Sequence, residues 1–92
     1  MGITNTNFDK LMKDVTKFEK KAGFDKTSEK QLISWLEEEI KNYRDAKTNI
    51  IKRNKLIDIL MLSMQIAIRR DWSLDNAWKR WWWKSQKYLK EK

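Results

Sequence analysis

The chain has 92 residues, of which 37% are charged and 40% apolar, and a net charge of +8. This length suits one small domain, so we expect residues 1–92 to form a single helical unit without a separate catalytic domain. The lack of Cys and His excludes Cys and His nucleophiles, a Ser-His-Asp triad, the usual zinc sites and a disulfide framework. With no Pro and only two Gly, the sequence favours long helices, and the predicted class is all-α.

The first predicted helix covers residues 8–22. Its apolar side chains recur at steps of three and four residues, which is the spacing of one helical face. These side chains are Phe8, Leu11, Met12, Val15, Phe18 and Ala22. Gly23 then supplies the left-handed conformation in which many helices end.

The second predicted helix begins after Ser28, which has Gln31 three residues later in the spacing of a capping box. It ends near Ala46. Its apolar stripe consists of Leu32, Leu36, Ile40 and Tyr43.

The third predicted helix follows Thr48 or Asn49 and is the most apolar part of the chain. Ten of the thirteen residues from Leu56 to Ile68 are apolar, so we expect this helix to run through the middle of a bundle. The stretch is too short and too interrupted for a membrane span, which needs about 20 apolar residues. No secretory signal is recognisable, so we expect a cytoplasmic protein without a membrane partner.

Asp71 and Ser73 end the third helix and cap a fourth, whose stripe consists of Leu74, Trp78, Trp81, Ser85 and Tyr88. The short connections between the four helices predict an antiparallel four-helix bundle. Because one small protomer cannot cover this much apolar surface, we expect a dimer or a larger homo-oligomer.

Two carboxylates fall on apolar faces. Glu39 lies three residues after Leu36 on the second helix, and Asp58 lies inside the apolar stretch of the third, where water should not easily reach it. A buried carboxylate without a partner costs several kcal/mol, so each needs a cation, a metal ion or a raised pKa. Two acids that face each other across a helix pair could hold Mg²⁺. Alternatively, Asp58 pairs with Lys55 or Arg44, and Glu39 lies at the bundle edge.

Residues 35–46 and 55–60 resemble the two acidic helices of the MazG-like all-α nucleoside triphosphate pyrophosphohydrolases, and the likeness extends from the region of Phe18 to Tyr88. That family carries E-E-x-x-E on one helix and E-x-x-D on the next. Glu38 and Glu39 fill the first two acidic positions, and Asp58 fills the last. Asn42 and Lys55 replace the remaining two glutamates.

The resemblance implies that Glu38, Glu39 and Asp58 are catalytic and metal-binding residues. They would hold Mg²⁺, which gathers the triphosphate and activates a water for hydrolysis of a nucleoside triphosphate to its monophosphate and pyrophosphate. Asn42 offers only a carbonyl oxygen, and the positive charge of Lys55 repels a divalent ion. We therefore expect a weak or absent Mg²⁺ site and impaired or lost hydrolysis, with Lys55 neutralising Asp58 or Glu39 instead.

The C-terminal half carries the entire excess of positive charge, since residues 47–92 contain twelve basic and four acidic residues. Five of the six tryptophans lie between Trp72 and Trp83. The consecutive side chains of residues 81–83 point about 100° apart on a helix, so at least one of them should be exposed or lie at an interface. The predicted partner-binding residues are Trp78, Lys79, Arg80, Trp81, Trp82, Trp83, Lys84 and Lys87.

This interleaving of aromatic and basic residues allows three interpretations. The rings could stack on bases while the cations neutralise phosphates, they could anchor a dimer or another protein, or two or three of them could simply fill the core. A membrane-surface helix is disfavoured because the apolar residues are spread around the helix. The second functional hypothesis is therefore a non-enzymatic binding or inhibitor module that docks nucleic acid or an acidic protein surface.

Overall fold

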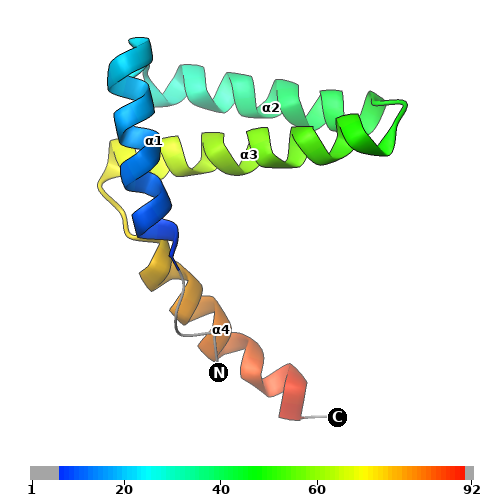
Figure 1. The fold of residues 1–92 in the computed structure, drawn as a ribbon. Helices are drawn as coiled ribbons and strands as arrows, with labels where there is room; N and C mark the ends of the chain where they lie inside the picture. The colour runs from blue at the N-terminus through cyan, green and yellow to red at the C-terminus, as the bar shows by residue number, and fades with distance from the viewer. Residues whose placement is uncertain (1–6, 91–92) are drawn as a thin grey trace.

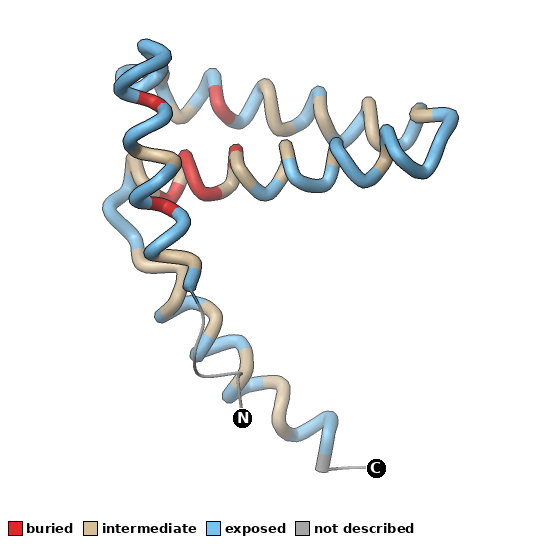
Figure 2. The backbone as a smooth tube through the Cα atoms, viewed as in Figure 1, coloured by how far each residue is buried: buried red, intermediate tan, exposed pale blue. Residues whose placement is uncertain are grey.

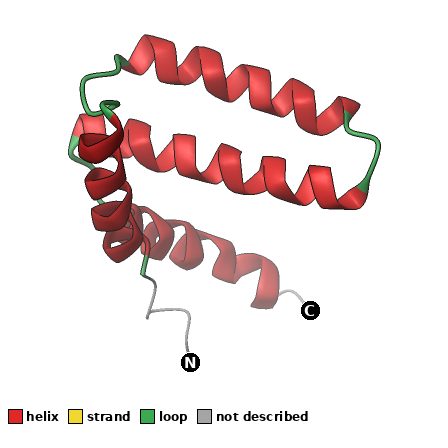
Figure 3. Ribbon diagram, turned by 45° about the horizontal axis from the view of Figure 1, so that its top comes forward, coloured by secondary structure: helices red, strands yellow, loops and turns green. Residues whose placement is uncertain are grey.

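The computed structural model describes residues 7–90 and is helical throughout, with no strand in that range (Figures 1 and 3). The four helices are α1 (Phe8–Ala22), α2 (Glu29–Asp45), α3 (Asn49–Arg70) and α4 (Leu74–Lys90). The predicted all-α class is confirmed. None of the described helices combines the length and apolar composition that a membrane span requires.

The helix ends lie where the sequence predicts them. The backbone of Gly23 has a φ of 84° at the end of α1, and that of Asp71 has a φ of 56° at the end of α3. The hydroxyl oxygens of Ser28, Thr48 and Ser73 each accept a hydrogen bond from the backbone N–H three residues ahead, at 3.1, 3.2 and 3.1 Å. These caps satisfy N–H groups that the first turn of a helix leaves without partners.

Helices α2 and α3 form a hairpin, α1 packs against α3, and α4 packs against α1. α2 and α3 run antiparallel and side by side, and α1 crosses the end of this hairpin where α2 begins and α3 ends (Figures 1 and 3). α4 contacts the first part of α1 and extends away from the hairpin. Most of the surface of α4 is therefore not covered by the other described helices.

The apolar core lies at the crossing of α1 and α3 (Figure 2). Met12 packs there against Met64 and Ala67, with Ile68 and Leu74 at the edge. Burial of apolar surface at this crossing joins α1 and the start of α4 to the end of the hairpin.

The buried face of α1 differs from the predicted stripe. Leu11 and Phe18 are exposed, whereas Glu19 is buried with 1% of its surface accessible. Glu19 forms a bidentate ion pair with Arg69 of α3, at 3.0 and 2.7 Å, and accepts a hydrogen bond of 2.7 Å from Gln65. The helix is thus rotated so that this carboxylate, and not Phe18, faces α3.

The apolar stretch of α3 is only partly buried, so the expectation that it runs through the middle of a bundle is wrong for the single chain. Leu62, Met64 and Ala67 are buried, but Leu56 is exposed and Ile57 is 63% exposed. α1 crosses α3 and does not run along it, so among the described helices α2 is the close neighbour of the first half of α3 (Figure 1).

Candidate functional site

The predicted acidic site lies on the hairpin, where four residues of its two motifs meet. The Lys55 ammonium lies 3.1 Å from Glu39 Oε1 and 3.8 Å from Asp58 Oδ2. The amide of Asn42 donates a hydrogen bond of 3.1 Å to the same Oε1. The ion pair predicted from the sequence is therefore present, and Lys55 shares its charge between a carboxylate on each helix.

The contacts in this cluster shift the pKa values of Glu39 and Lys55. The hydrogen bond from Asn42, aided by Lys55, holds the pKa of Glu39 below its ordinary value, although partial burial opposes the shift. Glu39, with a smaller contribution from Asp58, raises the pKa of Lys55. At neutral pH Glu39 is therefore a carboxylate that faces the ammonium of Lys55.

Two expectations about the carboxylates have different outcomes. Glu39 is half-buried between α2 and α3, as its place on the apolar stripe indicated. The Asp58 side chain is 40% exposed, so the expectation that water could not easily reach it is wrong. The reason is the open first half of α3, which α1 does not cover.

The residues present do not suit Mg²⁺. Within residues 7–90, no three carboxylates are arranged so that they could hold a metal ion. Glu38 is exposed and lies about 100° around α2 from Glu39. The space that a cation would share between Glu39 and Asp58 is held by the ammonium of Lys55, and bringing a divalent ion there requires that ammonium to leave.

The predicted partner-binding residues divide between two faces of α4. Trp78 and Trp82 are half-buried, and the Trp78 ring lies 6.0 Å from that of Phe8 on α1. The exposed residues are Lys79, Arg80, Trp81, Trp83, Lys84 and Lys87. The expectation that at least one of the three consecutive tryptophans is exposed is confirmed.

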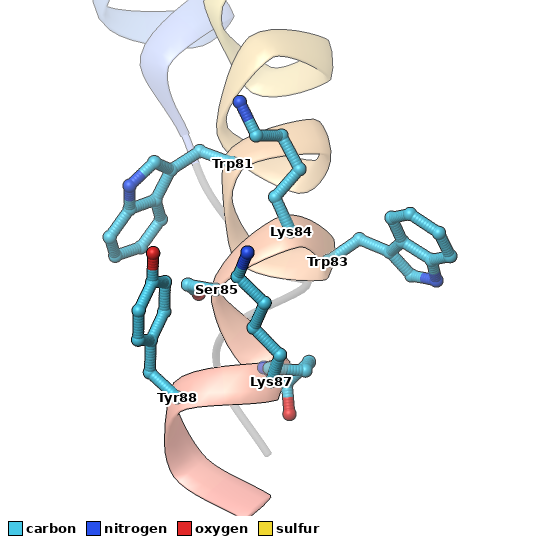
Figure 4. Close-up of a pocket in the computed structure, with 7 residues that line it drawn as sticks. Trp81, Trp83, Lys84, Ser85, Lys87 and Tyr88 are labelled. Atoms are coloured by element: carbon cyan, nitrogen blue, oxygen red, sulfur yellow. The ribbon is translucent and has the colours of Figure 1, made fainter.

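The exposed aromatic rings border an open hollow of about 800 Å³ on α4 (Figure 4). Lys84 and Lys87 lie between the rings of Trp81 and Tyr88 on one side and the ring of Trp83 on the other. The sequence predicts Tyr88 only as part of the stripe of the fourth helix, and the structure shows that its ring extends this aromatic surface.

The start of α4 is held by a carboxylate that the sequence analysis missed. Asp9 of α1 accepts hydrogen bonds from the Ser73 hydroxyl at 2.6 Å and from the Leu74 N–H at 3.0 Å. Asp75 in turn accepts one of 2.8 Å from the backbone N–H of Phe8. The two helix N-termini therefore cap each other, a long-range arrangement that carries no local sequence signal.

No family model, curated protein or solved structure matches this chain. The hairpin cluster and α4 are therefore the features that bear on its function.

Proposed function

We propose that this chain is a non-catalytic binding module, built on a degenerate MazG-like pyrophosphohydrolase scaffold, which docks an acidic partner through α4. The observation that carries the proposal is the position of the Lys55 ammonium between Glu39 and Asp58. This internal cation does the neutralising work of a metal but cannot polarise a phosphoryl group or activate a water as a metal does. We also propose that the protein acts in the cytoplasm, where nucleotides and nucleic acids are abundant.

The cations of α4 support the proposal that this helix docks an acidic partner. Among the described residues, Lys79, Arg80, Lys84 and Lys87 form no ion pair with a carboxylate. Cations that are already paired with carboxylates have less to gain from an anionic partner, whereas the contact that the structure shows for these four is that of the Lys87 ammonium with the Tyr88 ring, 5.1 Å from its centroid.

The decisive experiment measures pyrophosphate release from canonical and modified nucleoside triphosphates with Mg²⁺ or Mn²⁺. We expect no turnover above the protein-free rate. Robust turnover that disappears in Asp58→Ala would show that the chain is a pyrophosphohydrolase and refute the proposal.

A second experiment tests whether Lys55, together with Asn42, weakens the binding of Mg²⁺. The double variant Lys55→Glu with Asn42→Glu restores the acidic pattern, and we expect calorimetry to show at least about a tenfold gain in Mg²⁺ affinity. The control, Lys30→Glu with Gln31→Glu, makes the same change in net charge at exposed positions of α2. An equal gain in the control would show that Mg²⁺ responds only to net charge and not to the cluster.

Self-association belongs to the same proposal. The exposed part of the α3 apolar face continues the stripe that α1 covers farther along the helix, and it includes Ile50, Ile57 and Leu60. We propose that a second copy covers this part and completes an antiparallel bundle, because exposed apolar stripes of this length are unfavourable in water. Light scattering at micromolar concentration should give at least twice the mass of one chain, and a strictly monomeric particle would contradict this part of the proposal.

A further inference from the structure

We propose that the acidic partner of α4 is a single-stranded nucleic acid, whose phosphates lie along Lys84 and Lys87 while its bases stack on Trp81 and Tyr88. This inference rests on the proposed function, in which α4 is the docking element. It adds the chemical class of the partner and the way in which the helix binds it.

The cations of α4 form one continuous surface. From the 100° advance per residue of an α-helix, the four exposed cations lie within about 140° of its circumference, with Trp83 near the middle. They are Lys79, Arg80, Lys84 and Lys87. The only carboxylate in the sequence of α4, Asp75, lies in its first turn and accepts a hydrogen bond from the Phe8 N–H. No acidic side chain of α4 thus interrupts this surface.

Trp81 and Tyr88 border the cationic surface, Trp83 lies within it, and all three rings are exposed. Trp81 is 52%, Tyr88 62% and Trp83 79% accessible. Trp81 and Tyr88 are seven residues apart and lie on the same side of the lysine pair (Figure 4). Their separation along the axis is about 10.5 Å, which corresponds to about three base steps of 3.4 Å. A strand of three to four nucleotides could therefore contact both rings and both lysines at once.

The residue types favour nucleic acid over an acidic protein. Lysine is depleted in the buried centre of protein interfaces, yet three of the four cations here are lysines. Lysine suits phosphates as a compact point charge, and exposed indole and phenol rings stack on any base. A membrane surface fits less well because it requires apolar and cationic faces that are separate, whereas Trp83 lies among the cations.

The test measures fluorescence anisotropy of a labelled oligothymidylate and a labelled oligouridylate, each of about 15 nucleotides. We expect affinity to fall about 50-fold between about 50 and 200 mM salt, if all four cations contact phosphates with a slope of about −0.7 per contact. Trp81→Ala with Tyr88→Ala should weaken binding about 5- to 150-fold for each stacked base that is lost. The control Trp72→Ala removes another exposed indole, outside α4, and should leave the affinity unchanged.

A charge-matched pair of variants tests the phosphate contacts. Replacing the four cations of α4 with Gln should remove most of the salt dependence, whereas the control should retain it. The control replaces four exposed lysines of α1, α2 and their connection with Gln: Lys20, Lys21, Lys26 and Lys30. Equal losses in the two variants, or equal affinity in the ring variant and Trp72→Ala, would overturn the inference.

Other outcomes separate this inference from the proposed function. If a polyglutamate peptide binds through the α4 cations and neither oligonucleotide does, the partner is an acidic protein; the inference then fails and the docking role of α4 stands. If oligonucleotides bind through α4 but the chain also releases pyrophosphate, the inference stands and the non-catalytic proposal fails.

Discussion

Replacing Arg69 with Met should be among the most destabilising single changes in this protein. The guanidinium makes four hydrogen bonds, two to the Glu19 carboxylate and one each to the carbonyl oxygens of Phe24 and Thr27, at 2.7 to 3.0 Å. It thereby connects α3 with the end of α1 and with the segment that leads into α2. Without it, the Glu19 carboxylate stays buried with only the amide of Gln65 as a partner.

The expected magnitude follows from the burial of Glu19. Removing one partner of a buried ion pair costs about 3–5 kcal/mol, because the remaining charge is left without compensation. A domain of this length has a free energy of unfolding of about 5–14 kcal/mol, at 0.05 to 0.15 kcal/mol per residue. Arg69→Met should therefore remove a large part of the stability and lower the melting temperature by at least about 12 °C.

Urea denaturation, followed by circular dichroism and tryptophan fluorescence, measures this loss. The neighbouring residue provides a matched control, since Arg70 also forms a bidentate pair, with Glu29, but its side chain is 53% exposed. Exposed pairs contribute little, so Arg70→Met should change the urea midpoint only slightly. Arg69→Met with Glu19→Met should recover part of the loss, because neither charge is then stranded. If Arg69→Met and Arg70→Met have the same midpoint, the buried network does not stabilise the fold as argued.

Three further predictions concern the caps, the acidic cluster and the open face of α3. Asp9→Ala should cost about 1 kcal/mol and speed hydrogen exchange in the first turn of α4. Because the Ser73 hydroxyl is the main group that holds the pKa of Asp9 below its ordinary value, the wild-type chain, but not the variant, should lose this stability in urea titrations as the pH falls below about 4. Lys55→Met should raise the pKa of Glu39 in an NMR titration, and an unchanged value would mean that Asn42 alone sets it. Ile57→Asp should reduce the mass found by light scattering, and an unchanged oligomer would place the interface elsewhere.

The local features of the fold were predictable because they depend on neighbouring residues. Gly23 ends α1, and Ser28 and Thr48 start the next two helices, each through a contact within one turn. The rotation of α1 was not predictable from periodicity. The pattern of apolar residues favours Phe18 over Glu19 for the buried face of α1. The position of Arg69, 50 residues farther along the chain, reverses that preference because it pairs with Glu19.

In the candidate site, too, contacts within one helix were predictable and contacts between distant segments were not. The pairing of Lys55 with Asp58 is a contact between residues three positions apart on one helix, and the sequence indicated it. The exposure of Asp58 depends on where α1 crosses α3, which spacing within α3 does not determine. The mutual capping of α1 and α4 through Asp9 and Asp75 joins residues more than 60 positions apart and could not be read from either segment.

The acidic cluster and α4 occupy separate parts of the structure. The acidic cluster lies on the hairpin, in the half of α3 before Ile59, whereas α4 departs from the opposite end of α3 and contacts α1 (Figure 1). A substitution of Lys55 should therefore change the hairpin cluster without disturbing the caps that hold α4. The four cations and three exposed rings of α4 lie on a different element from that cluster. The affinity of α4 for an anionic strand should therefore be the same in Lys55→Met as in the unaltered chain. A change in oligonucleotide affinity in that variant would show that the two surfaces are coupled.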